Sequence, residues 1–214
     1  MNVLIVISSK FPNEKLYECI EKLYEIQINE ALENYKICVI DSDSDDFMYY
    51  RKINENFPNV EIHFIKNKNY EYGAWKNAHI IYPNYDIYFC IQDSYIIQKK
   101  IDLSIINDNT VYTAHRFSGY NEHIGIKEEG IQFLKDSGLN YESIIDTDFN
   151  LAWGSMFIVN NYIITDIFKT LQIEPINKNG SCIYERNFGI YFIIKEINTI
   201  NFFDYFIKFH SGRQ

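Results

Sequence analysis

Acidic side chains that close apolar runs are the first candidates for chemistry in this sequence. Asp93 follows the run IYFCIQ and precedes Ser94, and Asp41 closes the run KICVID. An isolated carboxylate at such a position can be an oxygen ligand of a divalent cation, accept a hydrogen bond from a ribose, or cap the helix that follows. The two acids therefore indicate a polar ligand site or, at Asp93, a cap for a helix turn over residues 94–99.

Three other acids are candidates for proton transfer. Glu185 lies at the start of an apolar stretch of helical period, and Asp146 and Asp148 lie in the polar run IIDTDF. A carboxylate that reaches an acceptor hydroxyl can remove its proton as a general base. Glu185 could equally be an acid of a first helical turn, which the helix dipole favours. We take Glu185 as the first candidate for the base, with Asp146 and Asp148 as competitors.

The elements that must position these residues alternate between short apolar runs and longer stretches of helical period. This alternation predicts an α/β fold with a mostly parallel central sheet flanked by helices. The expected strands are residues 2–8, 36–41, 60–66, 86–92, 110–116, 152–159 and 199–209. The expected helices are residues 13–34, with Asn13 as N-cap, 45–56, 71–82, 160–171 and 183–197. Residues 117–150 are expected to be irregular and to face the substrate.

In an open α/β sheet the ligand lies outside the carboxyl ends of the strands, so the residues that follow each strand matter most. No GxGxxG motif follows the first strand, which disfavours a dinucleotide-binding dehydrogenase. Gly73 permits either a turn or the close approach of a ligand. The residues found at these strand ends are Ser8, Asp41, Ser42, Asp43, Asn69, Gly73, Gln92, Asp93 and Ser94.

Composition limits the classes of protein that remain. The 214 residues are 47% hydrophobic, enough for the core of a single domain, and 20 basic against 29 acidic side chains give a net charge of −9. That charge disfavours nucleic acid as a partner. Four widely spaced cysteines and the lack of a stretch of about 20 apolar residues predict a soluble, cytoplasmic protein without a transmembrane segment.

Several of these stretches, taken in order, resemble motifs of the GT-A fold glycosyltransferases, and in particular are similar to glycosyltransferase family 2. VIDSDSDD resembles the loop that contacts the nucleoside, NKNYEYGAWKNA a segment near the donor, and IYFCIQDS the strand that leads into the metal-binding DXD motif. AWGSMFIV and CIYERNFGIYF resemble the later Gly-containing strand and the base-bearing helix start. The resemblance covers most of the chain, although one carboxylate stands where the DXD motif has two.

The resemblance implies a Rossmann-like single domain, with residues 1–100 binding the nucleotide and residues 101–214 the acceptor. It implies an enzyme of the EC 2.4 class that moves a sugar, by inversion, from a nucleotide-diphosphate sugar to a glycan or other hydroxyl acceptor. Mn²⁺ or Mg²⁺ would be held by Asp93 and His210. The implied donor-binding residues are Ser8, Asp41, Ser42, Asp43, Asn69, Gly73, Gln92, Asp93, Ser94 and Arg213, and the implied acceptor-binding residues are Trp153 and Gly154.

Other interpretations remain open from the sequence. Gln92, in place of a carboxylate, favours a non-catalytic nucleotide- or sugar-binding domain of the same fold. A nucleotidyltransferase would need a Gly-rich loop after the first strand, and SSKFPNEK has no glycine. The acidic loop after Asp41 could be a solvated run of like charges, and the tail that holds His210 and Arg213 could be frayed. His115 and Arg116 close a strand on the expected ligand side.

Overall fold

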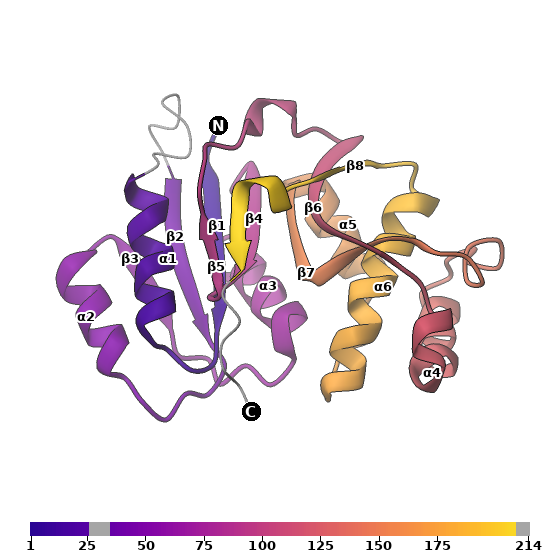
Figure 1. Cartoon of the computed structure of the whole chain (residues 1–214), viewed down its shortest axis with the longest axis horizontal. Helices are drawn as coiled ribbons and strands as arrows, with labels where there is room; N and C mark the ends of the chain where they lie inside the picture. The colour runs from indigo at the N-terminus through magenta and orange to yellow at the C-terminus, as the bar shows by residue number, and fades with distance from the viewer. Residues whose placement is uncertain (26–34, 209–214) are drawn as a thin grey trace.

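The computed structural model describes residues 1–25 and 35–208, which form one seven-stranded sheet covered on both faces (Figure 1). The strand order is β3-β2-β1-β4-β7-β6-β8. β7 runs antiparallel to its neighbours β4 and β6, and the other described pairings of this sheet are parallel. The strands are β1 (Val3–Ser9), β2 (Tyr35–Asp41), β3 (Val60–His63), β4 (Ile87–Gln92), β6 (Thr110–Ser118), β7 (Phe149–Asn160) and β8 (Asn198–Asn201).

Helices cover both faces of the sheet, as Figure 1 shows. Helices α1 (Glu14–Glu25) and α2 (Met48–Asn56) pack on one face, together with a small sheet of β5 (Tyr95–Ile97) and β9 (Phe206–Lys208). Helices α3 (Tyr70–Ile81), α4 (Ile124–Asp136), α5 (Asn161–Thr170) and α6 (Lys178–Ile194) pack on the other. The predicted α/β class with a mostly parallel sheet is therefore confirmed.

The central strands are apolar because both of their faces are buried. In β1, Val3, Ile5 and Ile7 face the side of α1, whereas Leu4 and Val6 face the side of α3, and all five are fully buried. Side chains of a strand alternate between its faces, so a strand covered by helices on both sides appears in the sequence as a continuous apolar run. This is why the period of the sequence identified the central strands.

A crevice for a ligand follows from the order of the strands. From β1 the chain moves outward to β2 and β3, and then returns through α3 to β4 on the other side of β1. Where the strand order reverses in this way, the connecting segments diverge and leave space at the carboxyl ends. Ser8 of β1 lies opposite Gln92 of β4, and the Ser9 hydroxyl donates to Asp93 Oδ2 at 2.7 Å. The reversal of the strand order thus lies beside Asp93.

Several predicted elements were wrong in type or extent. Residues 94–99 hold β5 instead of a helix turn, and residues 117–150, expected to be irregular, contain α4. Residues 199–209 were expected to be one strand, but β8 and β9 are separated there by a 3-10 turn at Phe203–Tyr205. The described part of the expected helix 13–34 ends at Glu25, and residues 26–34 lie outside the described residues.

Helix α6 begins earlier than expected, and this changes the position of Glu185. Its N-cap is Asn177, whose side chain accepts a hydrogen bond from the Gly180 amide at 2.8 Å. Glu185 therefore lies two turns into the helix, so the alternative of a first-turn acid was wrong. Across residues 1–25 and 35–208, no helix has both the length and the apolar character needed to cross a membrane.

Candidate functional site

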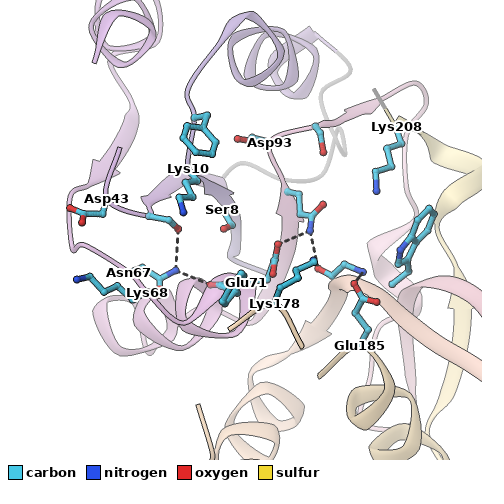
Figure 2. A pocket seen from close by; sticks show the side chains of 17 residues that line it. Ser8, Lys10, Asp43, Asn67, Lys68, Glu71, Asp93, Lys178, Glu185 and Lys208 are labelled. Carbon is cyan, nitrogen blue, oxygen red and sulfur yellow. Dashed lines mark hydrogen bonds between the residues drawn. The ribbon is translucent and has the colours of Figure 1, made fainter. Parts of the chain in front are cut away.

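A cavity of about 660 Å³ opens at the carboxyl edge of the sheet, over the reversal between β1 and β4 (Figure 2). Residues from both halves of the chain line it. Nine of them are candidates from the sequence: Ser8, Ser42, Asp43, Gln92, Asp93, Ser94, Trp153, Gly154 and Glu185. The rule that ligands bind at the carboxyl ends of strands therefore located the cavity.

Asp41 is turned away from this cavity and holds the loop that follows it. Its side chain is buried and accepts hydrogen bonds from the Ser44 amide at 3.1 Å, from the Ser44 hydroxyl, and from the Tyr50 hydroxyl at 2.7 Å. These bonds leave Ser42 and Asp43 at the cavity wall, where Asp43 has a φ of 64°. The role predicted for Asp41 in nucleoside contact stays a prediction, and its bonds indicate that it shapes the loop.

Gly73 and Asn69 support the cavity wall without lining it. A Cβ at Gly73 would lie 2.1 Å from Asn67 Oδ1, so this glycine makes room for the Asn67 side chain. Asn67 lines the cavity, and its amide group donates to Ser42 Oγ at 3.2 Å and to the Tyr70 carbonyl at 2.7 Å. Asn69 donates to the Pro175 carbonyl at 3.2 Å. The sequence predicted Asn69 as the donor ligand of this segment, whereas Asn67 is the asparagine that lines the cavity.

Two glutamates also line the cavity, Glu71 from α3 and Glu185 from α6. Glu185 Oε1 accepts a hydrogen bond from the Gly154 amide at 3.1 Å, and Glu71 Oε1 accepts one from Gln92 Nε2 at 2.7 Å. Burial raises the pKa of Glu185 above its ordinary value, while Lys178 and the Gly154 amide act in the opposite direction. A carboxylate with a raised pKa, facing a cavity, is suited to accept a proton near neutral pH.

Glu71 was missed by the sequence analysis. It lies in the first turn of α3, close to Gly73, where an acid is usually explained as a favourable charge at a helix N-terminus. In the structure it also accepts a hydrogen bond from the Ser181 hydroxyl at 3.2 Å. It therefore links β4, through Gln92, to the start of α6.

The competing acids Asp146 and Asp148 lie away from the cavity. Asp146 is exposed and pairs with Lys127 at 2.5 Å. Asp148 is also exposed. Its side chain packs against Gly119, where an added Cβ would lie 2.9 Å from Asp148 Oδ1. His115 bonds to Thr199 Oγ1 at 3.1 Å. Of the three candidates for the base, Glu185 is thus the one at the cavity.

Four lysines also line the cavity: Lys10, Lys68, Lys178 and Lys208. None of them forms an ion pair with another described residue, although Lys76, Lys127 and Lys195 elsewhere on the surface do. Lys10 comes directly after β1, so the strand-end rule points to it, whereas Lys68 lies in the loop between β3 and α3. Lys178 and Lys208 reach the cavity only through the tertiary structure.

The wall formed by β7 has an unusual backbone. Gly154 and Ser155 have φ values of 64° and 55°, next to a register shift between β6 and β7. The Ser155 carbonyl accepts a hydrogen bond from Trp75 Nε1 at 2.8 Å, which ties the bulge to α3. Bulges of this kind are frequent beside active sites because they redirect a side chain. Here the bulge turns the Gly154 amide toward Glu185 and brings Trp153 to the cavity.

Two cations lie close to the ring of Trp153. The Lys208 ammonium lies 4.2 Å and the Arg116 guanidinium 5.3 Å from the centre of its ring. Both contacts are close enough for cation–π attraction, which helps to hold the ring at the cavity wall. Trp153 and Gly154 both line the cavity, and their acceptor-binding role stays a prediction.

The predicted metal ligands are only partly described. Asp93 lies at the cavity and is nearly buried, whereas His210, like the predicted donor ligand Arg213, lies outside the described residues. In the part of the chain that the structure describes, no group of three or more His, Cys, Asp or Glu side chains could hold a metal ion.

No family model matches the sequence, and no curated protein sequence matches it. Among solved structures, the fold is similar to TarS 1–349 from S. aureus, with a TM-score of 0.48, 9% identity, and coverage of 96% of this chain and 60% of that one. For TarS from S. aureus, the TM-score is 0.49 and the identity 9%, and the match covers 99% of this chain and 37% of that one. For the mannosyltransferase PcManGT from Pyrobaculum calidifontis, in complex with GDP-Man and Mn²⁺, the TM-score is 0.40 and the identity 14%. That match covers 53% of this chain and 35% of that one. This chain thus spans less than two thirds of each.

Proposed function

We propose that this chain is a glycosyltransferase that moves a sugar from a nucleoside diphosphate sugar to an acceptor hydroxyl with inversion. The observation that carries the proposal is a single cavity in which Glu185, the bulge at Gly154 and four lysines without ion partners among the described residues face the carboxyl ends of β1 and β4. A base and a set of cations across one cavity suit a reaction that takes a proton from one substrate and releases an anion from the other.

The donor fits the side of the cavity formed by β1, β2 and α3. Figure 2 shows Lys10, Asn67, Lys68 and Asp43 on this side, with Ser8 toward the middle. Hydroxyls, an amide and a carboxylate can hydrogen-bond a nucleoside, and ammonium groups attract phosphates. We propose that residues 1–100 bind the nucleotide in this way, with the phosphates lying over the ends of β1 and β4.

The acceptor fits the opposite side, where Glu185, Trp153 and Gly154 lie. In the reaction, the acceptor oxygen attacks the anomeric carbon while its proton passes to the Glu185 carboxylate. The bond from the anomeric carbon to the phosphate oxygen breaks, and its electron pair leaves with the nucleoside diphosphate. Attack opposite to the leaving group inverts the anomeric configuration, which makes one displacement sufficient.

The residues that the structure describes do not make a resident Mn²⁺ or Mg²⁺ site by themselves. Asp93 is the one acid at the end of β4, and its Oδ2 already accepts the Ser9 hydroxyl. A divalent cation of this kind takes six or more oxygen ligands and relies on carboxylates for charge. Gln92, which ends β4 at a position where a second acid would help, instead donates to Glu71. We therefore derive no step through a metal, and the predicted cation stays a prediction.

A non-catalytic nucleotide- or sugar-binding domain is the second candidate, and the Gln92–Glu71 hydrogen bond favours it. Such a domain would bind the donor without turnover. Release of nucleoside diphosphate from a nucleotide sugar, with or without added acceptors, separates the two candidates, because only the enzyme breaks the glycosyl bond.

A panel of nucleoside diphosphates and their sugars, measured by thermal shift, tests the donor. A ligand at a hundredfold excess over its Kd stabilises the folded state by about 2.7 kcal/mol, which raises the Tm of a chain of this size by roughly 5–11 °C. We expect at least one nucleoside diphosphate to give such a shift at millimolar concentration. If every member of the panel leaves the Tm unchanged, the glycosyltransferase proposal and the nucleotide-binding form of the second candidate are both wrong.

A further inference from the structure

Lys178 and Lys208 reach the same side of the cavity from two distant elements. Lys178 is the first residue of α6, directly after its N-cap Asn177. Lys208 ends β9, where it pairs across the small sheet with Tyr95 of β5. Since Tyr95 follows Asp93 and Ser94, this pairing carries Lys208 to the carboxyl end of β4. Figure 2 shows both side chains extending into the cavity near Glu185.

Neither ammonium group forms an ion pair with a described residue, although Glu185 and Glu71 lie near enough to affect the pKa of Lys208. Burial lowers the pKa of Lys208; the carboxylates of Glu185 and Glu71 oppose this, and the charges of Lys178 and Arg116 add to it. Two cations that repel each other and are kept out of ion pairs leave the site prepared for an anion.

Among residues 1–25 and 35–208, the oxygen ligands at the same place are too few for a metal. Asp93 is shared with the Ser9 hydroxyl, and Gln92 donates its amide to Glu71. A divalent cation would also meet the repulsion of Lys178 and Lys208. The charge that leaves with a nucleoside diphosphate must nevertheless be stabilised, and fixed cations at the leaving group can do this.

Resting on the proposed function, we propose that Lys178 and Lys208 stabilise the departing diphosphate, so that donor binding and transfer do not depend on a divalent cation. The bond from the anomeric carbon to the β-phosphate oxygen breaks with its electron pair on that oxygen. The two ammonium groups donate hydrogen bonds to the phosphate oxygens and keep their protons, while the acceptor proton goes to Glu185. No other reactant is needed.

Titration calorimetry with UDP and GDP, each in EDTA and in Mn²⁺, tests this role in the whole chain. The variants are Lys178→Met, Lys208→Met and the charge-preserving Lys208→Arg. Lys127→Met is the matched control, because Lys127 is a lysine outside the cavity that pairs with Asp146. We expect the same Kd in EDTA as in Mn²⁺, a weakening of about tenfold or more in each cavity Lys→Met variant, and no change in the control. Binding of the nucleoside alone should not change in any variant.

Turnover separates a role at the leaving group from a structural one. We expect Lys208→Met to lower kcat as well as affinity, and Lys208→Arg to restore much of both. Lys178 is exposed, so Lys178→Met carries the test if Lys208→Met fails to fold. A Kd that requires Mn²⁺, together with wild-type affinity in both Lys→Met variants, would overturn this inference and leave the glycosyltransferase proposal standing. Absence of binding by every nucleoside diphosphate would instead remove the proposed function itself.

Discussion

Glu185 is a half-buried carboxylate whose environment disfavours the ionised form. Burial is the largest effect, and the nearby Glu71 adds to it, whereas Lys178, Arg186 and the Gly154 amide oppose both. The net result is a raised pKa. Keeping the Glu185 carboxylate ionised therefore costs stability. Such a cost is expected at a site where the charge is needed for a reaction.

Replacing Glu185 with Gln should separate activity from stability. Turnover should fall by about 10² to 10⁴, the usual effect of removing a general base, while nucleoside diphosphate affinity stays near wild type. The glutamine can still accept the Gly154 amide, so the fold is preserved. Steady-state kinetics and calorimetry measure both effects. Unchanged turnover would return the base to Asp146 or Asp148.

The same substitution should change the pH dependence of stability in a defined direction. Because the folded-state pKa of Glu185 lies above the ordinary 4.5, the wild type loses stability as pH rises from that value through the folded pKa. Glu185→Gln lacks this loss and should have an equal or higher Tm at pH 7. Tm measured from pH 4 to pH 8 in both proteins checks this, and a variant with a lower Tm at pH 7 would contradict it.

The pH dependence of turnover should be bell-shaped. Glu185 must be ionised to accept a proton, so the rate rises with pH through its raised pKa. Lys208 must be protonated to stabilise the diphosphate, so the rate falls as pH rises through its pKa, which burial holds below 10.5. Lys208→Arg should move the alkaline limb to higher pH. An alkaline limb identical in both proteins would exclude Lys208 as its source.

At the scale of elements, strand β7 carries the geometry of the site. Gly154 adopts a φ of 64°, and a Cβ there would lie 3.0 Å from Gln92 Nε2 and 3.2 Å from Gln92 Cδ. The bulge therefore depends on a residue without a side chain. Gly138, after α4, has a similar φ of 67° but open space around it. Substitution of Gly138 tests backbone strain alone, whereas substitution of Gly154 tests the same strain together with crowding of Gln92.

Gly154→Ala and Gly138→Ala should therefore differ in activity. Each should lose about 1–2 kcal/mol of unfolding free energy, because an L-residue is strained at positive φ. Only Gly154→Ala should also displace Gln92 and the amide that holds Glu185, and so lower turnover by tenfold or more. Chemical denaturation and kinetics measure the two quantities. Equal turnover in the two variants would show that the bulge does not support the site.

At the scale of the whole molecule, the two halves share one core. The apolar cluster on the α3 face joins Leu4, Trp75 and Tyr88 of the first half to Leu151 and Phe188 of the second. β4 pairs with β7 across the same boundary. Neither half can bury its apolar face without the other, so the fold requires both.

Unfolding of the chain should consequently be one cooperative transition. The two tryptophans, Trp75 in the first half and Trp153 in the second, provide a reporter for each. In Trp153→Phe and in Trp75→Phe, the midpoint of urea unfolding by fluorescence should coincide with the midpoint of the same variant by circular dichroism. Separate transitions would show that the nucleotide-binding and acceptor-binding halves, as proposed, unfold independently.

The sequence by itself determined the fold class and the edge of the sheet where the site lies. Buried strands appear as apolar runs because helices cover both of their faces, and polar residues that follow such runs gather at one edge of a parallel sheet. Ser8, Gln92 and Asp93 were found in this way. Helix α4 was missed because the glycines and charges of residues 124–136 weaken its helical period.

Only the tertiary structure decided which polar groups face the cavity. Ser44 and Tyr50 hold the Asp41 carboxylate inside the loop, and no local pattern shows that a strand-end acid will turn inward. Lys208 reaches the site through the pairing of β5 with β9, which joins segments far apart in the chain. Such contacts depend on how the elements pack, and side chains distant in sequence become neighbours only when the whole core has formed.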